Sequence, residues 1–518
     1  MKIKINTERT KGNVNPMIYG HFVEHFHRQV YGGVFDPSSK FADEVGLRTD
    51  VIEALKQIKT PIMRWPGGCF VDDYRWEKGV GEKRTPVFDK NWRVEEPHTF
   101  GTDEFINFCR KIEAEPFICT NGGTATPEDA SNWIEYCNLE NEGEFAKQRI
   151  ANGHKEPYNV KYWSIGNENY YPMQIGHKDV EEWSKFTAQS AKLLTRITPN
   201  LELSVAATVS DLDWTYKILK ENKHELKWIS LHGYWDAVTW GEWGHVDTTY
   251  GIPAVFHSLI PYISMDGKNA NYEKVMSILN HPELPVKKLR GVFDSLDIDH
   301  IKITYDEWNL RAWMHPCVTS GVTKEEYLYP RNMTDDNSIY TMADALFTAG
   351  FLNMCIRNSD IIGMANFSPV VNGRGAIFTH ENGIVKRSTY HVFDLYANKM
   401  GDKFVDTWSG DIEKYEVNDV EVDVFDIVSA IRTSDNVLTV SVLNKHATDS
   451  KPLKLAFEGD INPVSYSIHS VVGTHKDAYN DIDRTDVTTE QTASDKPFVA
   501  GEEIEFPPHS VSIIELKL

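Results

Sequence analysis

The chain has 518 residues, of which 41% are hydrophobic and 25% are charged, and its formal net charge at pH 7 is −22. These values are ordinary for a globular protein and exclude a disordered or fibrous chain. The negative charge would repel phosphate backbones and anionic membrane surfaces, which argues against nucleic-acid and lipid binding. The length favours about three domains, although a barrel often uses more residues as one unit.

The opening residues, Met1 to Thr10, lack the apolar core of a signal peptide. No run of about 18 apolar residues predicts a membrane span. The cysteines stand at Cys69, Cys109, Cys119, Cys137, Cys317 and Cys355. They are scattered, without a C-x-x-C pair, which favours reduced thiols. The sequence therefore predicts a cytoplasmic protein without membrane contact.

Up to about residue 400, short apolar segments alternate with longer amphipathic ones. Strands are predicted at 62–65, 115–120, 160–165, 203–207, 228–232 and 301–305. Between two of them, Val180 to Ile197 carries apolar residues at helical spacing. Such alternation favours parallel βαβ units and, at this length, a (β/α)8 TIM barrel as the catalytic domain over residues 16–400.

Beyond residue 400 the segments become short and β-branched. They lie at 422–430, 437–443, 453–457, 464–468 and 504–516, separated by Gly, Asn, Asp and Pro. This texture is typical of an all-β, jelly-roll-like sandwich, which we expect at 401–518. Residues 2–5 also alternate, so the segment 1–15 is expected to add an N-terminal strand to it.

Two predicted barrel strands run into a carboxylate. Gly166-Asn167-Glu168 follows the strand at 160–165, and Asp306-Glu307-Trp308-Asn309 follows that at 301–305. Catalytic groups of a barrel gather at the carboxyl ends of its strands. The gap between the two glutamates would hold three βα units, which places them on the fourth and seventh strands. A lone Glu is usually a surface residue, but a facing pair suits glycoside hydrolysis.

A third segment, Arg64-Trp65-Pro66-Gly67-Gly68-Cys69, continues at Trp76-Glu77-Lys78-Gly79-Val80-Gly81. Alone, its Pro-Gly-Gly indicates only a turn. Together with the two glutamate segments, with Ile18-Tyr19-Gly20-His21-Phe22-Val23-Glu24-His25, with Leu231-His232-Gly233-Tyr234 and with Pro507-Pro508-His509-Ser510-Val511, it resembles glycoside hydrolase family 51, the α-L-arabinofuranosidases. The matching segments occur in order along almost the whole chain.

The resemblance implies that Glu168 is the general acid/base and Glu307 the nucleophile of a retaining, exo-acting double displacement. Its substrate would be arabinose-containing oligosaccharides, from which it releases terminal non-reducing α-L-arabinofuranosyl residues. The two carboxyls should lie roughly 5–5.5 Å apart. Glu168 would need a raised pKa so that it is protonated at first. The resemblance implies no metal and no cofactor, and it implies a homo-oligomer, expected to be a hexamer.

Four residues that match the family are expected to act directly on the sugar or on the nucleophile. Asn167 would hydrogen-bond the sugar 2-hydroxyl. Arg64 and Tyr234 would keep Glu307 ionised, because donors and positive charge favour a carboxylate. Glu24 would line the arabinose pocket.

Four further residues are expected in the substrate pocket. His232 would line it beside Glu24, and Trp308, next to the nucleophile, is expected to contact substrate. Cys69 stands where the family usually has Asn, and Pro369 where it often has Gln. A thiol is a weak hydrogen-bond partner, so the pocket is expected to recognise the sugar hydroxyls differently.

Three alternatives remain open. A related retaining glycosidase, a β-xylosidase or β-glucanase, would share the same fold and carboxylates. A metal-dependent barrel hydrolase would use His25-Phe26-His27 with His232, although no ordered set of further ligands follows. A non-catalytic carbohydrate-binding protein would keep the barrel but lose one carboxylate, and this chain has both.

Overall fold

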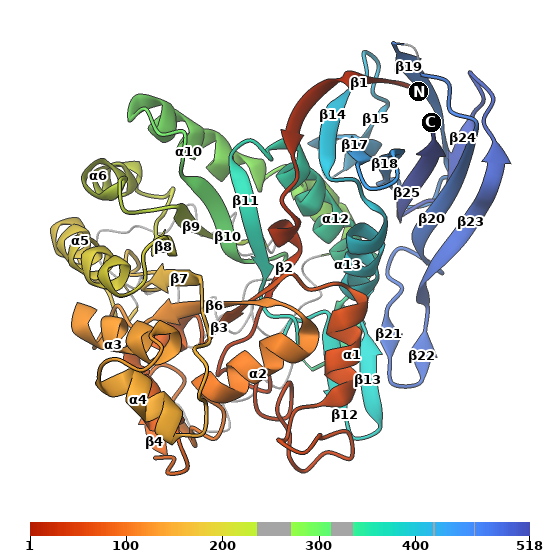
Figure 1. The fold of residues 1–518 in the computed structure, drawn as a ribbon. Helices are drawn as coiled ribbons and strands as arrows, with labels where there is room; N and C mark the ends of the chain where they lie inside the picture. Colours follow the sequence, from red (N-terminus) through yellow and green to blue (C-terminus); the bar gives the residue numbers. More distant parts are fainter. Residues whose placement is uncertain (173, 236–270, 312–334, 418–419, 460) are drawn as a thin grey trace.

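The computed structural model describes residues 1–172, 174–235, 271–311, 335–417, 420–459 and 461–518. Its larger part is a closed barrel of eight strands in the order β10-β11-β2-β3-β6-β7-β8-β9 (Figure 1), and every neighbouring pair is parallel. The strands are β2 (Gly20–Phe22), β3 (Ile62–Trp65), β6 (Glu115–Thr120), β7 (Tyr162–Ile165), β8 (Glu202–Ala206), β9 (Trp228–Tyr234), β10 (Lys302–Asn309) and β11 (Ile362–Phe367). The predicted fold class, a (β/α)8 barrel followed by an all-β unit, is confirmed.

The strand that carries the second carboxylate is longer than predicted. The sequence indicates a strand that ends at Tyr305, but β10 runs to Asn309. Its pairing with β9 matches Thr304 to Ser230 and Glu307 to His232. An advance of three residues on β10 therefore lies opposite an advance of two residues on β9, which defines a β-bulge. In chain order β7 is the fourth barrel strand and β10 the seventh, as the spacing of the glutamates predicts.

Helices surround the barrel between its strands. They are α1 (Thr49–Gln57), α2 (Thr102–Ile112), α3 (Pro127–Asn138), α4 (Glu144–Ala151), α5 (Val180–Ile197), α6 (Leu212–Asn222), α9 (Tyr272–Ile278), α10 (Glu283–Ser295), α12 (Met342–Arg357) and α13 (Ser388–Lys399). Helix α5 has the predicted bounds. Helix α12 is buried from Met342 to Ile356, because it lies between the barrel and the second unit (Figure 1).

The second unit is one continuous sheet of nine strands in the order β23-β20-β25-β18-β17-β14-β1-β19-β24. They are β1 (Lys2–Asn13), β14 (Lys403–Trp408), β17 (Phe425–Arg432), β18 (Val437–Asn444), β19 (Lys451–Glu458), β20 (Ser465–Gly473), β23 (Val487–Pro497), β24 (Ile504–Phe506) and β25 (Ser510–Lys517). Strand β1 pairs with β14 in the antiparallel and with β19 in the parallel direction. The first strand of the chain thus lies inside the sheet.

The two faces of this sheet belong to different cores. On β25, Val511 and Ile513 join the barrel core, whereas Ile514 and Leu516 join a separate core of the sheet. Alternate residues of a strand point to opposite faces, so one face packs against α12 and α13 while the other encloses its own apolar interior. The described residues also form four small hairpins: β4 (Val87–Asp89) with β5 (Val94–Glu96), β12 (Ile377–His380) with β13 (Gly383–Lys386), β15 (Lys414–Val417) with β16 (Val420–Asp423), and β21 (Asn480–Asp481) with β22 (Arg484–Thr485).

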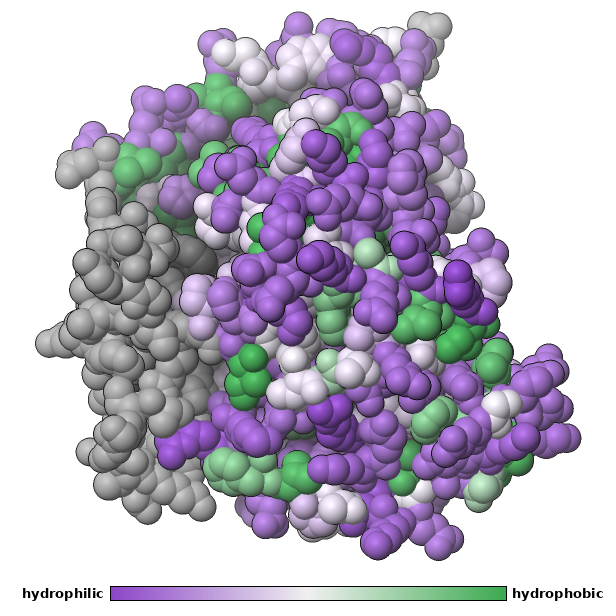
Figure 2. Space-filling model, turned by 90° about the vertical axis from the view of Figure 1, so that its left-hand side faces the viewer, coloured by the Kyte–Doolittle hydropathy of each residue, from purple (hydrophilic) through white to green (hydrophobic). Residues whose placement is uncertain are grey.

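The described cysteines, which exclude Cys317, are free thiols, as predicted. Cys317 lies outside the described residues. None of the helices within the described ranges has both the length and the hydrophobicity needed to cross a bilayer. The face in Figure 2 is largely hydrophilic and its apolar patches are small and separate, as is usual for single exposed apolar residues.

The ion pair of Arg357 with Asp426 is among those that link the barrel to the sheet. Arg357, at the end of α12, donates to Asp426 on β17 at 2.5 Å, and Asn353 donates to the same carboxylate at 3.4 Å.

We expect Asp426→Ala to destabilise the protein by about 1–3 kcal/mol, because it leaves the guanidinium without its charged partner. Urea unfolding measures this. Glu421→Ala, which removes the exposed partner of Lys414, is the control and should cost less than about 0.5 kcal/mol; equal losses would contradict the prediction.

Candidate active site

The first glutamate is presented by a tight turn at the end of β7. Gly166 has φ +69° and Glu168 has φ +49°, both in the left-handed region that glycine adopts freely and other residues adopt at a cost. The turn is closed by the amide of Tyr171, which donates to the Glu168 carbonyl at 2.7 Å. The backbone therefore bends sharply and turns the carboxyl of Glu168 back over the barrel.

The β-bulge on β10 brings two successive carboxylates to one cation. Neighbouring residues of a regular strand face opposite sides, yet Asp306 and Glu307 both contact Arg64. The Arg64 Nη1 donates to Glu307 Oε1 at 2.7 Å, and Nε lies 3.2 Å from Asp306 Oδ2. Asp306 was not predicted as a site residue, and the bulge is the reason that it reaches the site.

The bulge also decides the position of Trp308. Its ring stacks on Phe351 of α12, with centroids 3.7 Å apart, and packs against Phe367 and Phe393. Trp308 is fully buried on the side of β10 that faces the helices. The prediction that Trp308 contacts substrate is therefore wrong: it is a core residue behind the nucleophile candidate.

Arg64 connects the two glutamate segments. This residue of β3 is fully buried, and its Nη2 donates to Asn167 Oδ1 at 2.8 Å. Asn167 is itself 1% exposed. Its Nδ2 has no hydrogen-bond partner among the residues that the structure describes. An amide hydrogen is thus available to a ligand hydroxyl between the two carboxylates.

Glu307 has a donor on each carboxylate oxygen. Arg64 holds Oε1, and the Tyr234 hydroxyl donates to Oε2 at 2.8 Å. The Tyr234 oxygen lies 3.0 Å from the Ser368 hydroxyl. Burial raises the pKa of Tyr234 well above its usual range, and the charge of Glu307 adds to this, so Tyr234 stays a donor.

His232, on β9, lies between the carboxylates. Its Nδ1 is 2.8 Å from Glu168 Oε1 and 3.4 Å from Glu307 Oε2, and its Nε2 is 3.4 Å from Asp306 Oδ1. Burial lowers the pKa of His232, but the charge of Glu307 and the contacts with Asp306 and Glu168 outweigh it and raise the pKa to about 10. The imidazolium stabilises the fold most below pH about 6.5, and this contribution is lost as the pH rises toward 10.

The pKa of Glu168 differs from the expectation. Burial raises it, but the hydrogen bond and charge of His232, with the hydrogen bond from Gln174, lower it below its ordinary value. The prediction of a raised pKa is therefore wrong for the free site. The reason is that His232, 2.8 Å away, shares the proton of the pair and so favours the Glu168 carboxylate.

Glu24, Cys69 and their partners form one side of the site. Glu24 Oε1 accepts hydrogen bonds from the Phe70 amide and from Trp92 Nε1, both at 3.0 Å. Burial, and then the charge of Glu307, raises the pKa of Glu24 to about 8. Gln174 Nε2 donates to Glu168 Oε2 at 2.6 Å and to Cys69 Sγ at 2.9 Å.

Sequence reasoning missed Trp92 and Gln174 as site residues, because both reach the carboxylates from loops. Trp92 stands between β4 and β5. Gln174 stands in the loop between β7 and α5. Pro369 is buried beside Gly373, and its neighbour Ser368 has its hydroxyl 3.0 Å from that of Tyr234. The prediction that Pro369 faces the sugar stays a prediction.

The histidines of the alternative metal site have other partners. His25 Nδ1 lies 3.0 Å from Glu96, and its Nε2 accepts from Trp65 Nε1 at 2.9 Å. His27 Nε2 lies 3.3 Å from Asp335. Within the described residues, the group that could offer three ligand atoms to a metal is formed by Glu168, His232 and Glu307, whose atoms lie within 4.8 Å of one another.

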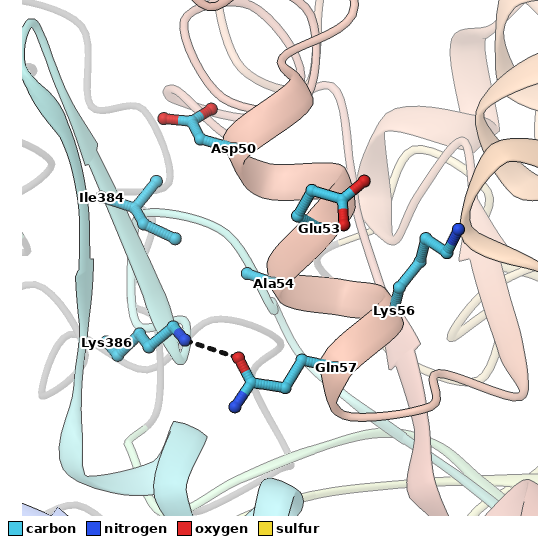
Figure 3. A pocket seen from close by; sticks show the side chains of 7 residues that line it. All are labelled: Asp50, Glu53, Ala54, Lys56, Gln57, Ile384 and Lys386. Atoms are coloured by element: carbon cyan, nitrogen blue, oxygen red, sulfur yellow. Dashed lines mark hydrogen bonds between the residues drawn. The ribbon is translucent and has the colours of Figure 1, made fainter.

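A separate hollow of about 480 Å³ lies between α1 and β13 (Figure 3). Its lining is Asp50, Glu53, Ala54, Lys56, Gln57, Ile384 and Lys386. Lys386 donates to Gln57 across it at 2.7 Å, and Asp50 is paired with Arg48. Neither Glu168 nor Glu307 lines this hollow, so the candidate site remains the cluster around Arg64.

Profiles of known families match both parts of the chain. One described as "Alpha-L-arabinofuranosidase 1 domain" matches residues 54–242, and one described as "Alpha-L-arabinofuranosidase C-terminal domain" matches residues 306–510. The α-L-arabinofuranosidase C of Emericella nidulans is 30% identical, over 99% of this chain and 97% of its own. The intracellular exo-α-(1→5)-L-arabinofuranosidase 1 of Bacillus subtilis is 28% identical, over 99% and 98%.

A solved structure is similar over the full length. The GH51 α-L-arabinofuranosidase of Thermotoga petrophila superposes with a TM-score of 0.76 at 30% identity, and the match covers 100% of both chains. The likeness therefore includes the barrel and the C-terminal sheet together.

The charge of His232 is testable through Asp306. We expect Asp306→Asn to lower the pKa of His232 by about one unit or more, because it removes a carboxylate that favours the imidazolium. NMR titration of histidine labelled with ¹³C measures it, and the spectrum of a His232→Gln variant identifies the resonance. Ser230→Ala removes only the hydroxyl that donates to Asp306 and should change the pKa less. An unchanged pKa in Asp306→Asn would refute the arrangement.

Proposed function

The chain belongs to the α-L-arabinofuranosidases of glycoside hydrolase family 51, and from this premise we propose that Glu168 and Glu307 carry out its hydrolysis by double displacement. The observation that carries the proposal is the spacing of the two carboxylates. An oxygen of Glu168 lies within 4.8 Å of an oxygen of Glu307. So short an approach favours the spacing of retaining enzymes, whose carboxyl groups lie about 5–5.5 Å apart, over the roughly 6.5–9.5 Å of inverting enzymes.

Glu307 is the proposed nucleophile. Its two oxygens accept hydrogen bonds from Arg64 and Tyr234, which stabilise its negative charge before attack. Attack of one oxygen on the anomeric carbon forms a glycosyl ester and breaks the glycosidic bond. Tyr234 and Arg64 then donate to the ester, and they donate to the Glu307 carboxylate again once water has cleaved the ester.

Glu168 is the proposed acid/base, with His232 as the neighbouring store of its proton. The imidazolium shares its Nδ1 hydrogen with Glu168 Oε1 at 2.8 Å. Transfer of this proton to Glu168 and on to the leaving oxygen lets the glycosidic bond break. The carboxylate that results can then remove a proton from the attacking water.

The sugar pocket is proposed to lie between Asn167 and Glu24. The Nδ2 of Asn167, which has no hydrogen-bond partner in the described part of the chain, suits the sugar 2-hydroxyl. Glu24, whose pKa is raised to about 8 by burial and by the charge of Glu307, can donate as well as accept a hydrogen bond. A neutral sugar fits such a site because it brings no charge of its own.

The exo-acting mode and the arabinose-containing oligosaccharide substrate are supported by the names of the relatives. A cytoplasmic location is supported by the intracellular Bacillus subtilis relative. The homo-oligomer, expected to be a hexamer, and the division into units at 16–400 and 401–518 stay predictions.

A panel of aryl glycosides tests the substrate. We expect clear turnover of the α-L-arabinofuranoside and at least about tenfold lower kcat/KM on the β-D-xyloside, β-D-glucoside and β-D-galactofuranoside. Initial rates at matched concentrations measure this. Activity on the xyloside or glucoside alone would favour the related retaining glycosidases, and inactivity on all four would contradict the proposed function.

Azide separates the roles of the glutamates. We expect Glu307→Ala to lower kcat by at least about 10⁴-fold, because no ester forms. With an activated leaving group, azide should partly restore Glu168→Ala and yield the glycosyl azide of retained configuration, because the ester still forms and azide needs no base. With Glu307→Ala, azide should give the inverted product. The Glu421→Ala protein serves as the unaffected control, and the opposite pattern of products would exchange the two roles.

A further inference from the structure

Glu168 is held by a hydrogen-bond partner on each oxygen. His232 Nδ1 lies 2.8 Å from Oε1, and Gln174 Nε2 donates to Oε2 at 2.6 Å. His232 comes from β9, whereas Gln174 comes from the loop that follows Glu168 itself. A carboxylate with one donor on each oxygen has a single preferred orientation, so the plane of Glu168 is set before a ligand enters.

The amide of Gln174 has a second contact, which sets its own orientation. Nε2 also donates to Cys69 Sγ at 2.9 Å. An amide nitrogen carries two hydrogens and accepts none, so both of its hydrogens are used. The reverse orientation would place the amide oxygen against the carboxylate, with two acceptors facing each other. Burial, and then the charge of Glu168, raises the pKa of the Cys69 thiol well above its usual range, so the sulfur is neutral.

The loop that carries Gln174 is closed by its own hydrogen bonds. The Gln174 amide donates to the Tyr171 carbonyl at 3.0 Å, and the Lys178 amide to the Asn169 carbonyl at 2.9 Å. The Asn169 side chain donates to the Gly176 carbonyl at 2.8 Å. Gln174 therefore reaches back to Glu168 from a loop whose described residues are joined by these hydrogen bonds.

We propose that Gln174 is a positioning residue for Glu168, and that Cys69 acts on the reaction through Gln174 instead of through contact with the sugar. The proposal rests on the proposed role of Glu168 as acid/base. Gln174 neither gains nor loses a proton: Glu168 gives its proton to the leaving oxygen and later takes one from water. The amide holds the carboxyl in place for the first step and stabilises the carboxylate that acts in the second.

The surroundings allow the contribution of Gln174 to be isolated. The described charged or titratable groups that act on Glu168 are Arg64 from β3, Cys69 and Asp72 from the turn after β3, Tyr170 from the loop after β7, His232 and Tyr234 from β9, and Glu307 from β10. Gln174 is neutral, so replacing it changes none of these charges. The loss of a donor to the Glu168 carboxylate favours the form of the pair in which Glu168 holds the proton, and this raises the pKa at which the pair of Glu168 and His232 loses it.

Gln174→Met is the main test, because it keeps the length of the side chain and removes both donors. We expect kcat/KM on the aryl α-L-arabinofuranoside to fall by roughly 10- to 100-fold. We also expect the basic limb of its pH profile to move to higher pH, by up to about one unit. A purely structural role would lower activity or Tm and leave the limb in place, and that result would overturn the proposal.

Cys69 provides the second, independent arm. Cys69→Val should move the basic limb in the same direction as Gln174→Met, and Cys69→Ser, which keeps an acceptor, should restore most of it. In the Gln174→Met background, Cys69→Val should add less than about twofold, because its effect passes through the missing amide. If Cys69 contacts the sugar, Cys69→Val would raise KM by the same factor in both backgrounds, and the proposal would fail.

The controls keep the possible failures apart. Thermal unfolding of each variant reports its folding, and if Gln174→Met proves unfolded, the two Cys69 variants decide. A wild-type protein without turnover of any aryl glycoside would contradict the proposed function. An active wild-type enzyme whose pH profile Gln174→Met leaves unchanged would contradict the positioning role alone.

Discussion

The buried guanidinium of Arg64 is the interaction on which the rest of the site depends. It contacts Asp306, Glu307 and Asn167 without any exposure to solvent, and so ties β3, the turn after β7 and β10 together at their carboxyl ends. A cation is tolerated in such a place only where carboxylates and carbonyl oxygens surround it. The bulge in β10 meets this need, because it turns two successive carboxylates toward the same side chain.

The site around this cation is a problem of charge balance. Four carboxyls and two cationic groups gather there: Glu24, Glu168, Asp306, Glu307, Arg64 and His232. If every group were charged, two negative charges would remain in excess in a poorly solvated space. Burial and the charge of Glu307 relieve this by raising the pKa of Glu24 to about 8, so that it keeps a proton near neutral pH. The other available proton is shared between the imidazole and Glu168, the group that must deliver it.

Much of the fold and part of the site could be predicted from the sequence. The barrel strands are short apolar runs between turn residues, and each of the two glutamates follows one of them, so their convergence could be expected. The bulge could not be predicted, because no residue pattern in β10 indicates an extra residue. It changes the direction in which both Asp306 and Trp308 face. The pKa of Glu168 depends on His232, a residue of a different strand, and on Gln174, a loop side chain. The first is a long-range contact and the second depends on how the loop folds back, so neither follows from the residue pattern around Glu168.

The pairing of β1 makes the barrel an insertion within the sheet. Lys2 to Asn6 pair with Lys454 to Glu458, and the same strand pairs with β14, so some four hundred residues of barrel are looped out between two neighbouring strands. Cutting the chain after the barrel would not release two whole units, since the sheet would lose an interior strand and expose unpaired backbone groups. Separating them requires a circular permutation in which β1 follows β25 in the sequence. During synthesis β1 is the first strand to be made, and it stays unpaired until its partners β14 and β19 have been translated.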